Sequence, residues 1–136
     1  MAETGIYTSF KEYAGDGTID LDLHTFKCAL LNSTHTFDES NTVWTNVSPN
    51  EISGTGYTAG GTTMASVTWA ADGTTIKWDA ADVSWTTASF TAYHAVIYDS
   101  SASNSLLCSF DFGGAQTVSA GTFTIQWNAD GILRAS

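Results

Sequence analysis

Residues Met64–Tyr98, MASVTWAADGTTIKWDAADVSWTTASFTAYHAVIY, decide the fold class of this chain. Two apolar-rich runs, Met64–Trp69 and Thr74–Trp78, flank Ala70–Gly73, whose aspartate and glycine suit the turn of a β-hairpin. In Phe90–Tyr98 both faces of the alternating pattern carry apolar residues, which is typical of a central strand. The stretch therefore predicts antiparallel strands joined by short turns.

Strand-like runs continue on both sides of this stretch. They lie at about 19–23, 26–30, 106–112 and 122–127, a further short run lies inside the stretch at 83–85, and turn residues such as Gly113-Gly114 separate the runs. About eight short strands spaced by turns are typical of an antiparallel β-sandwich or jelly roll. Because 136 residues are few for two domains, we expect an all-β chain with a single β-sandwich domain over residues 16–136.

The first fifteen residues, 1–15, are the best candidate for a helix. Ile6, Phe10 and Tyr13 recur at i, i+4 and i+7, and a glycine follows where the helix would end. A helix this short is marginal alone and needs a surface to dock on. Ile6, Tyr7, Phe10 and Tyr13 are therefore candidate partner-binding residues, with docking onto the chain's own sandwich an equally open alternative.

The region between the strands at 26–30 and 64–69 is expected to be irregular. Thr36 and Glu39 form a T-x-x-E capping box, which predicts a short helical or looped segment at about 37–47 that Pro49 ends. The glycine-rich stretch Gly54–Gly61 lacks the G-K-[ST] ending of a phosphate-binding loop and a following helix. We interpret it as a loop that needs positive φ and a close backbone approach.

The charge balance excludes several classes of partner. Four basic residues face fourteen acidic ones, which gives a net charge of −10. Nucleic-acid binding depends on neutralising phosphates with Lys and Arg, so neither nucleic acid nor an anionic membrane surface is an expected partner. A mean hydropathy of −0.03 also argues against a membrane protein. A cationic protein surface is the natural complement.

Cys28 and Cys108 both lie inside apolar runs, which favours two buried free thiols. A disulfide is open to them only if their strands are neighbours. The start of the chain, Met1–Phe10, lacks the basic and apolar segments of a signal peptide. We therefore expect synthesis in a reducing cytosol.

No motif in the sequence indicates catalysis, a cofactor or a metal. The histidines His24, His35 and His94 show no metal-ligand spacing. Acidic pairs such as Asp79 and Asp82 fall where solvated turn residues are expected, without the spaced oxygen ligands of a calcium loop. No G-x-S-x-G nucleophile motif is present. We expect no enzymatic activity.

Five tryptophans leave one binding function open. Exposed Trp rings stack on sugars, so a carbohydrate-binding module is a rival interpretation. The alternative is that Trp69 and Trp78 form a cross-strand pair on the hairpin and that Trp44, Trp85 and Trp127 belong to the core or an interface.

Six stretches together resemble a known family. They are Gly17–Asp22, Phe26–Leu31, Asn50–Gly61, Tyr93–Asp99, Asp111–Gly113 and Phe123–Leu133. As a set they resemble a widespread family of small virion structural proteins in tailed bacteriophages. The resemblance spans nearly the whole chain, and the glycine-rich stretch is its most specific part.

The resemblance implies a structural role with no enzymatic activity. Decoration proteins of tailed phages are frequently compact β domains that bridge capsid subunits, and the acidic charge favours the outer head surface over a surface that meets packaged DNA. The implied partners are the major capsid protein and copies of the chain itself, in a homo-oligomer or a lattice. A tail or connector component is the alternative within the same class. The implied location is the outside of the phage head, after synthesis in the host cytoplasm.

Overall fold

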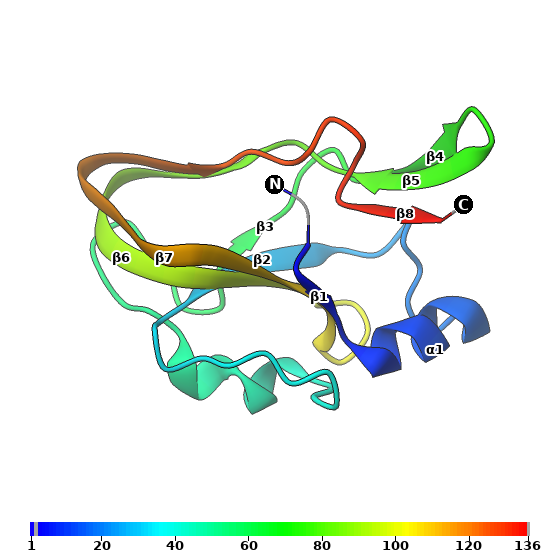
Figure 1. The fold of residues 1–136 in the computed structure, drawn as a ribbon, viewed down its shortest axis with the longest axis horizontal. Coiled ribbons are helices and arrows are strands. Elements are labelled where there is room, and N and C mark those ends of the chain that lie inside the picture. The colour runs from blue at the N-terminus through cyan, green and yellow to red at the C-terminus, as the bar shows by residue number, and fades with distance from the viewer. Residues whose placement is uncertain (2, 136) are drawn as a thin grey trace.

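The computed structural model describes residues 1 and 3–135 and is mostly β, with 48% strand, 11% helix and two antiparallel sheets (Figure 1). The strands are β1 (Gly5–Ile6), β2 (Phe26–Leu31), β3 (Thr62–Thr63), β4 (Thr68–Asp72), β5 (Thr75–Asp79), β6 (Val83–Asp99), β7 (Ser105–Ile125) and β8 (Leu133–Ala135). The helices are α1 (Thr8–Asp16) and two 3-10 turns, η1 (Trp44–Asn46) and η2 (Ser48–Asn50). The predicted β-rich chain with one short N-terminal α-helix is therefore confirmed at this level.

The strands form two sheets of unequal size. The large sheet has five strands in the order β1-β7-β6-β2-β3, and the small sheet has three in the order β4-β5-β8. Strand β6 lies between β7 and β2, which confirms the predicted central strand at Phe90–Tyr98. The predicted hairpin is also confirmed, because β4 pairs with β5 and places Trp69 directly opposite Trp78.

Strands β6 and β7 form one long ribbon, where the sequence predicted four separate strands. β6 has 17 residues and β7 has 21, and the predicted turn at Gly113-Gly114 lies inside β7. The two glycines have φ values of 78° and 149°, and the register shifts between Ala92 and His94, so the ribbon bends there while its pairing continues. Figure 1 shows the ribbon curving back over itself at its far end.

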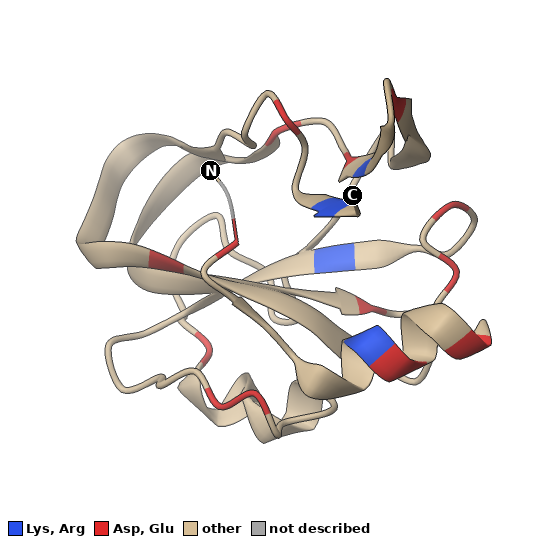
Figure 2. Ribbon diagram, turned by 45° about the vertical axis from the view of Figure 1, so that its right-hand side comes forward, with Lys and Arg blue, Asp and Glu red and all other residues tan. Residues whose placement is uncertain are grey.

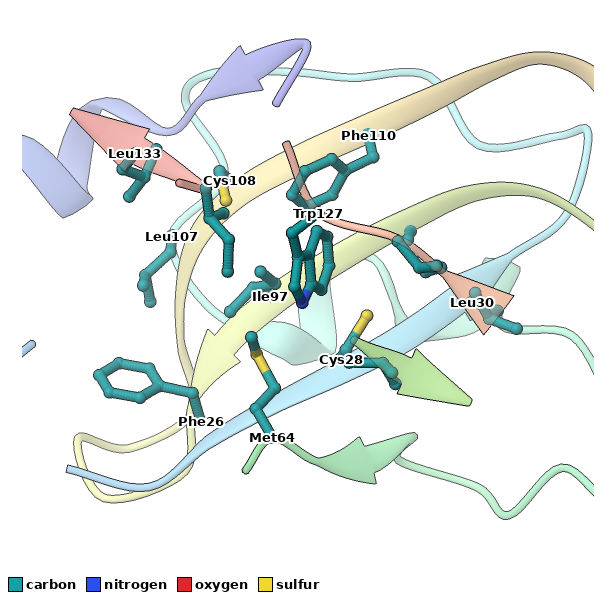
Figure 3. Packing of buried hydrophobic residues seen from close by; sticks show 14 of the residues in the cluster. Phe26, Cys28, Leu30, Met64, Ile97, Leu107, Cys108, Phe110, Trp127 and Leu133 are labelled. Carbon is teal, nitrogen blue, oxygen red and sulfur yellow. The ribbon is translucent and has the colours of Figure 1, made fainter. Parts of the chain in front are cut away.

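The core surrounds the C-terminal part of β6, where Ile97 lies between two cysteines (Figure 3). Ile97 pairs with Cys28 on one side and with Cys108 on the other. The cysteines are therefore two strand spacings apart, about 10 Å, which is beyond the reach of a disulfide. Both are buried free thiols, as expected, and burial raises the pKa of Cys28 to about 12.

The strand predicted at 19–23 is wrong. Ile19 and Leu21 are buried there, but the segment is a turn and Leu23 is 80% exposed. Asp20 causes the difference: its Oδ1 accepts hydrogen bonds from the backbone N–H groups of Asp22 (3.0 Å) and Leu23 (3.1 Å). A side chain that binds its own backbone in this way favours a turn over a strand.

The helical predictions need smaller corrections. The helix predicted within residues 1–15 is α1, but it begins only at Thr8, because Ile6 pairs in β1 with Cys108, and it continues through Gly15 to Asp16. The capping box at Thr36 begins no helix, and only η1 falls within 37–47. Pro49 lies inside η2, where the lack of an N–H costs nothing in the first turn.

Candidate binding groove

A groove of about 480 Å³ separates α1 from the small sheet. Its apolar lining combines Ile6, Phe10, Ala14, Leu21, Trp69 and Leu133. In Figure 1 the β4–β5 hairpin and α1 project on the same side of the molecule, with β8 between them. The groove therefore brings together three parts of the chain that are far apart in sequence: the N-terminal segment, the hairpin and the C-terminal strand.

The small sheet has one apolar face and one polar face. Trp69, Trp78 and Leu133 lie directly opposite one another on β4, β5 and β8, and thus share a face. Trp78 is fully buried, with its Nε1 donating to the backbone O of Leu21 (2.9 Å). Trp69 is 37% exposed and lines the groove, so this face passes from the core into the groove.

The next row on the same face consists of Ala71, Ile76 and Ala135, each two residues along its strand from the first row. Ala71 and Ala135 are exposed. On the opposite face, Arg134 lies 3.6 Å from Asp72. The sheet is therefore amphipathic, and the outer part of its apolar face extends beyond the core.

The four predicted partner-binding residues are divided by the structure. Tyr7 is fully buried in a second cluster on the other face of the large sheet, with Leu106. Phe10 is 7% exposed in the main core, and Ile6 and Tyr13 pack against it. The N-terminal segment thus docks on its own domain, the alternative that the sequence left open. Burial excludes Tyr7 as an accessible contact residue, whereas Ile6 and Phe10 line the groove.

The charged residues around the groove are mostly acidic. Glu3 and Asp20 line it, and Arg134 is the one cation among the described lining residues. The Arg134 guanidinium is already engaged, because its Nη1 lies 3.6 Å from carboxylate oxygens of both Asp72 and Asp130. Figure 2 shows the same imbalance over the molecule, with many acidic and few basic segments. A ligand in the groove therefore meets an unneutralised negative rim.

One wall of the groove is a tightly held turn. His24 Nδ1 lies 2.6 Å from Oδ2 of Asp99, a fully buried residue at the end of β6. Asp99 Oδ1 also accepts from the backbone N–H of Ser101 (2.8 Å). Within the described residues no Ser, Thr or Cys side chain hydrogen-bonds to His24. The effect of the His24–Asp99 pair is to fasten the Asp20 turn to the large sheet.

The other two histidines meet on the large sheet. The rings of His35 and His94 are 5.0 Å apart in an edge-to-face arrangement, and His94 Nδ1 lies 3.9 Å from Asp111. Burial, together with the neighbouring His94, lowers the pKa of His35 to about 4. Across residues 1 and 3–135, no group of three or more His, Cys, Asp or Glu residues is arranged to hold a metal ion.

The glycine-rich stretch is structural. A Cβ on Gly61, whose φ is +84°, would lie 2.1 Å from the backbone O of Cys28. Glu51 Oε2 accepts from the Tyr57 hydroxyl (2.7 Å) and from the backbone N–H of Gly60 (2.7 Å), which fixes the loop against β2. The prediction of positive φ and a close backbone approach is confirmed.

The tryptophans are mostly accounted for by packing. Trp78, Trp85 and Trp127 are 0–6% exposed, and Trp44 stacks on Tyr98 with ring centroids 4.9 Å apart. Among the five, all of which lie in the described part of the chain, Trp69 is the most exposed. The hairpin pattern identified Trp69 and Trp78 as a pair, but no sequence signal connected them with α1 or with Leu133.

Comparisons with protein-family models, curated proteins and solved structures found no match to this chain. In the described part of the chain, no helix has the length and apolar character needed to span a membrane.

Proposed function

We propose that this chain is a non-enzymatic structural protein of a tailed-phage particle, a decoration or cement protein that binds the outer surface of the head and bridges capsid subunits. The observation that carries the proposal is the groove: an apolar surface with Glu3 and Asp20 in its lining, and with no Ser, Thr, Cys, His or Lys among its described lining residues. The sequence resemblance supplies the phage context. We further propose that the two sheets make up an antiparallel β-sandwich or jelly roll.

The physical properties of the chain suit such a role. A lattice offers many identical sites, so modest contacts at each copy add up through effective concentration. The net charge of −10 keeps the protein soluble at high local concentration and disfavours contact with packaged DNA. The proposed partners are the major capsid protein and further copies of the chain, at the outside of the head, after synthesis in the host cytoplasm.

Copy number in purified particles tests this proposal directly. Quantitative gel densitometry should show the chain in amounts comparable to the major capsid protein. Particles assembled without it should lose their DNA at a lower temperature and regain stability when the purified chain is added back. A copy number of a few per particle would instead support a tail or connector component, and absence from particles would contradict the structural role.

A carbohydrate-binding module is the second candidate, and the exposed ring of Trp69 is the observation that favours it. An aromatic ring beside a groove can stack on a sugar. A glycan array probed with the intact protein and with Trp69→Ala separates the two functions. Binding to a defined glycan that is lost in the variant supports adhesion, and no binding by the intact protein excludes it.

A further inference from the structure

We propose that the groove between α1 and β8 takes an extended apolar segment of a different protein, flanked by Lys or Arg, and that a second copy of this chain is not its occupant. This inference rests on the proposed function in one respect, since the capsid lattice is what supplies the segment. The shape, the free strand edge and the charge of the groove each point to this occupant.

The shape indicates an apolar guest. The inner row of the small sheet is anchored in the core through Trp78, but Ala71 and Ala135 in the next row are exposed. A sheet normally buries its apolar face against another layer. The groove volume of about 480 Å³ falls within the usual range of ligand pockets. Bulky apolar side chains of a partner would complete the missing layer.

The strand edges indicate an extended backbone. β8 is the last strand of the small sheet and β1 is the last strand of the large sheet in the described structure, and residues of both line the groove. An edge strand presents unpaired N–H and C=O groups along one side. A partner segment that runs beside β8 would pair with them by strand addition, while its alternate side chains enter the groove.

The charge indicates a basic flank. Glu3 and Asp20 at the groove have no cation of the groove lining free to neutralise them, because Arg134 is bound by Asp72 and Asp130. Exposed ion pairs contribute little affinity individually. Charges of opposite sign do speed association, and the acidic groove disfavours acidic partners. The basic flank would therefore contribute to specificity more than to affinity.

The same charges argue against a second copy. Among the described residues, the large apolar side chains with the most exposure are Leu23 at 80%, Met1 at 37% and Trp69 at 37%. Leu23 follows Asp22 in a turn built on Asp20, so a copy offering it would bring carboxylates to an acidic rim. The Met1 amino group is engaged by the backbone O of Gln126.

A matched pair of variants tests the site. Ala135→Lys places a cation at the groove, whereas Ala70→Lys makes the same change on the opposite face of the same sheet, at another exposed alanine.

The probe is an array of random short peptides. The strongest binders of the wild-type protein should combine bulky apolar residues with Lys or Arg, and their affinity should fall about tenfold or more with Ala135→Lys and with Trp69→Ala. Ala70→Lys should bind as the wild type does.

Several results would overturn the inference. They are the absence of peptide binders, a preference for acidic peptides, equal binding by Ala135→Lys and Ala70→Lys, and a dimer in sedimentation analysis that Ala135→Lys dissociates. Experiments on phage particles distinguish a failure of this inference from a failure of the proposed function. Peptide binding without presence on particles contradicts the function alone. Ala135→Lys occupying heads as fully as the wild type contradicts the groove inference alone.

Discussion

The two sheets differ in how completely their residues are buried. In β2 of the large sheet five of six residues are buried, whereas all five residues of β4 in the small sheet are exposed. Consecutive residues on β6, Val96 and Ile97, belong to separate core clusters on the two faces of the large sheet. The part of the large sheet around β2 and the end of β6 therefore holds more of the core than the β4 edge of the small sheet does. The same kind of substitution should therefore change the free energy of unfolding by different amounts in the two sheets.

The largest difference is expected between two glycine substitutions. Gly61→Ala forces a Cβ to within 2.1 Å of the Cys28 carbonyl at a φ of +84°. Gly73, in the turn between β4 and β5, has a φ of +66° but open space around it. We expect Gly61→Ala to lower the free energy of unfolding by about 4 kcal/mol from overpacking and backbone strain combined, and Gly73→Ala by about 1 kcal/mol from strain alone. Urea denaturation measures both. Equal losses would show that the loop moves away freely from β2.

Two isoleucines test burial in the same way. Ile97 is fully buried at the centre of the large sheet, and Ile76 in β5 is only partly buried. Ile97→Ala should cost about 3–4 kcal/mol of unfolding free energy, because it leaves a cavity among Cys28, Cys108 and their neighbours. Ile76→Ala should cost about 1 kcal/mol, since little apolar surface is lost. A loss at Ile76 as large as that at Ile97 would mean that the outer part of the small sheet is buried in solution.

Acid should lower the free energy of unfolding through His35, which lies against the large sheet. His35 packs against His94 on β6, with Asp111 nearby, and its pKa is lowered to about 4 from an ordinary value of 6.5. The unfolded chain binds a proton at this residue near pH 6.5, whereas the folded protein does not until about pH 4. Stability conferred by the neutral His35 is therefore present above pH 6.5 and is lost as the pH falls to about 4.

The loss attributable to His35 should be about 2–3 kcal/mol. It is measured as the difference between urea denaturation of the wild type and of His35→Gln at pH 7 and at pH 4.5. The Gln side chain does not titrate, so the variant should lose less stability over this range. Parallel pH profiles for the two proteins would contradict the assignment.

Local pattern predicted the parts of the fold that local chemistry controls. The Trp69–Trp78 hairpin, the central strand and the conformation of Gly61 followed from turn residues and alternation. The strand at 19–23 failed because the Asp20 side chain competes for the backbone, which alternation does not reveal. The sequence predicts a turn at Gly113-Gly114, because sequence does not distinguish a bend within a paired ribbon from its end.

The groove was beyond sequence reasoning for a different reason. The N-terminal pattern identifies Ile6 and Phe10, but their position opposite Trp69 and Leu133 depends on how the two sheets pack. The buried Asp99 that holds His24 is equally remote in sequence. Pairings of this kind join residues whose spacing carries no period, so only tertiary structure shows them.

The smallest effect is expected on the polar face of the small sheet. Arg134 connects β8 to Asp72 of β4 and to Asp130, at 3.6 Å in each case. These pairs are exposed, so Arg134→Gln should change the unfolding free energy by no more than about 0.5–1 kcal/mol, and the change should vanish in high salt. Thermal unfolding at low and high ionic strength measures this. A larger loss that does not depend on salt would mean that the ion pairs of Arg134 hold the small sheet in place, rather than the anchoring of Trp78 and Leu133 in the core. The two sheets would then differ in the type of interaction that stabilises them and not in burial.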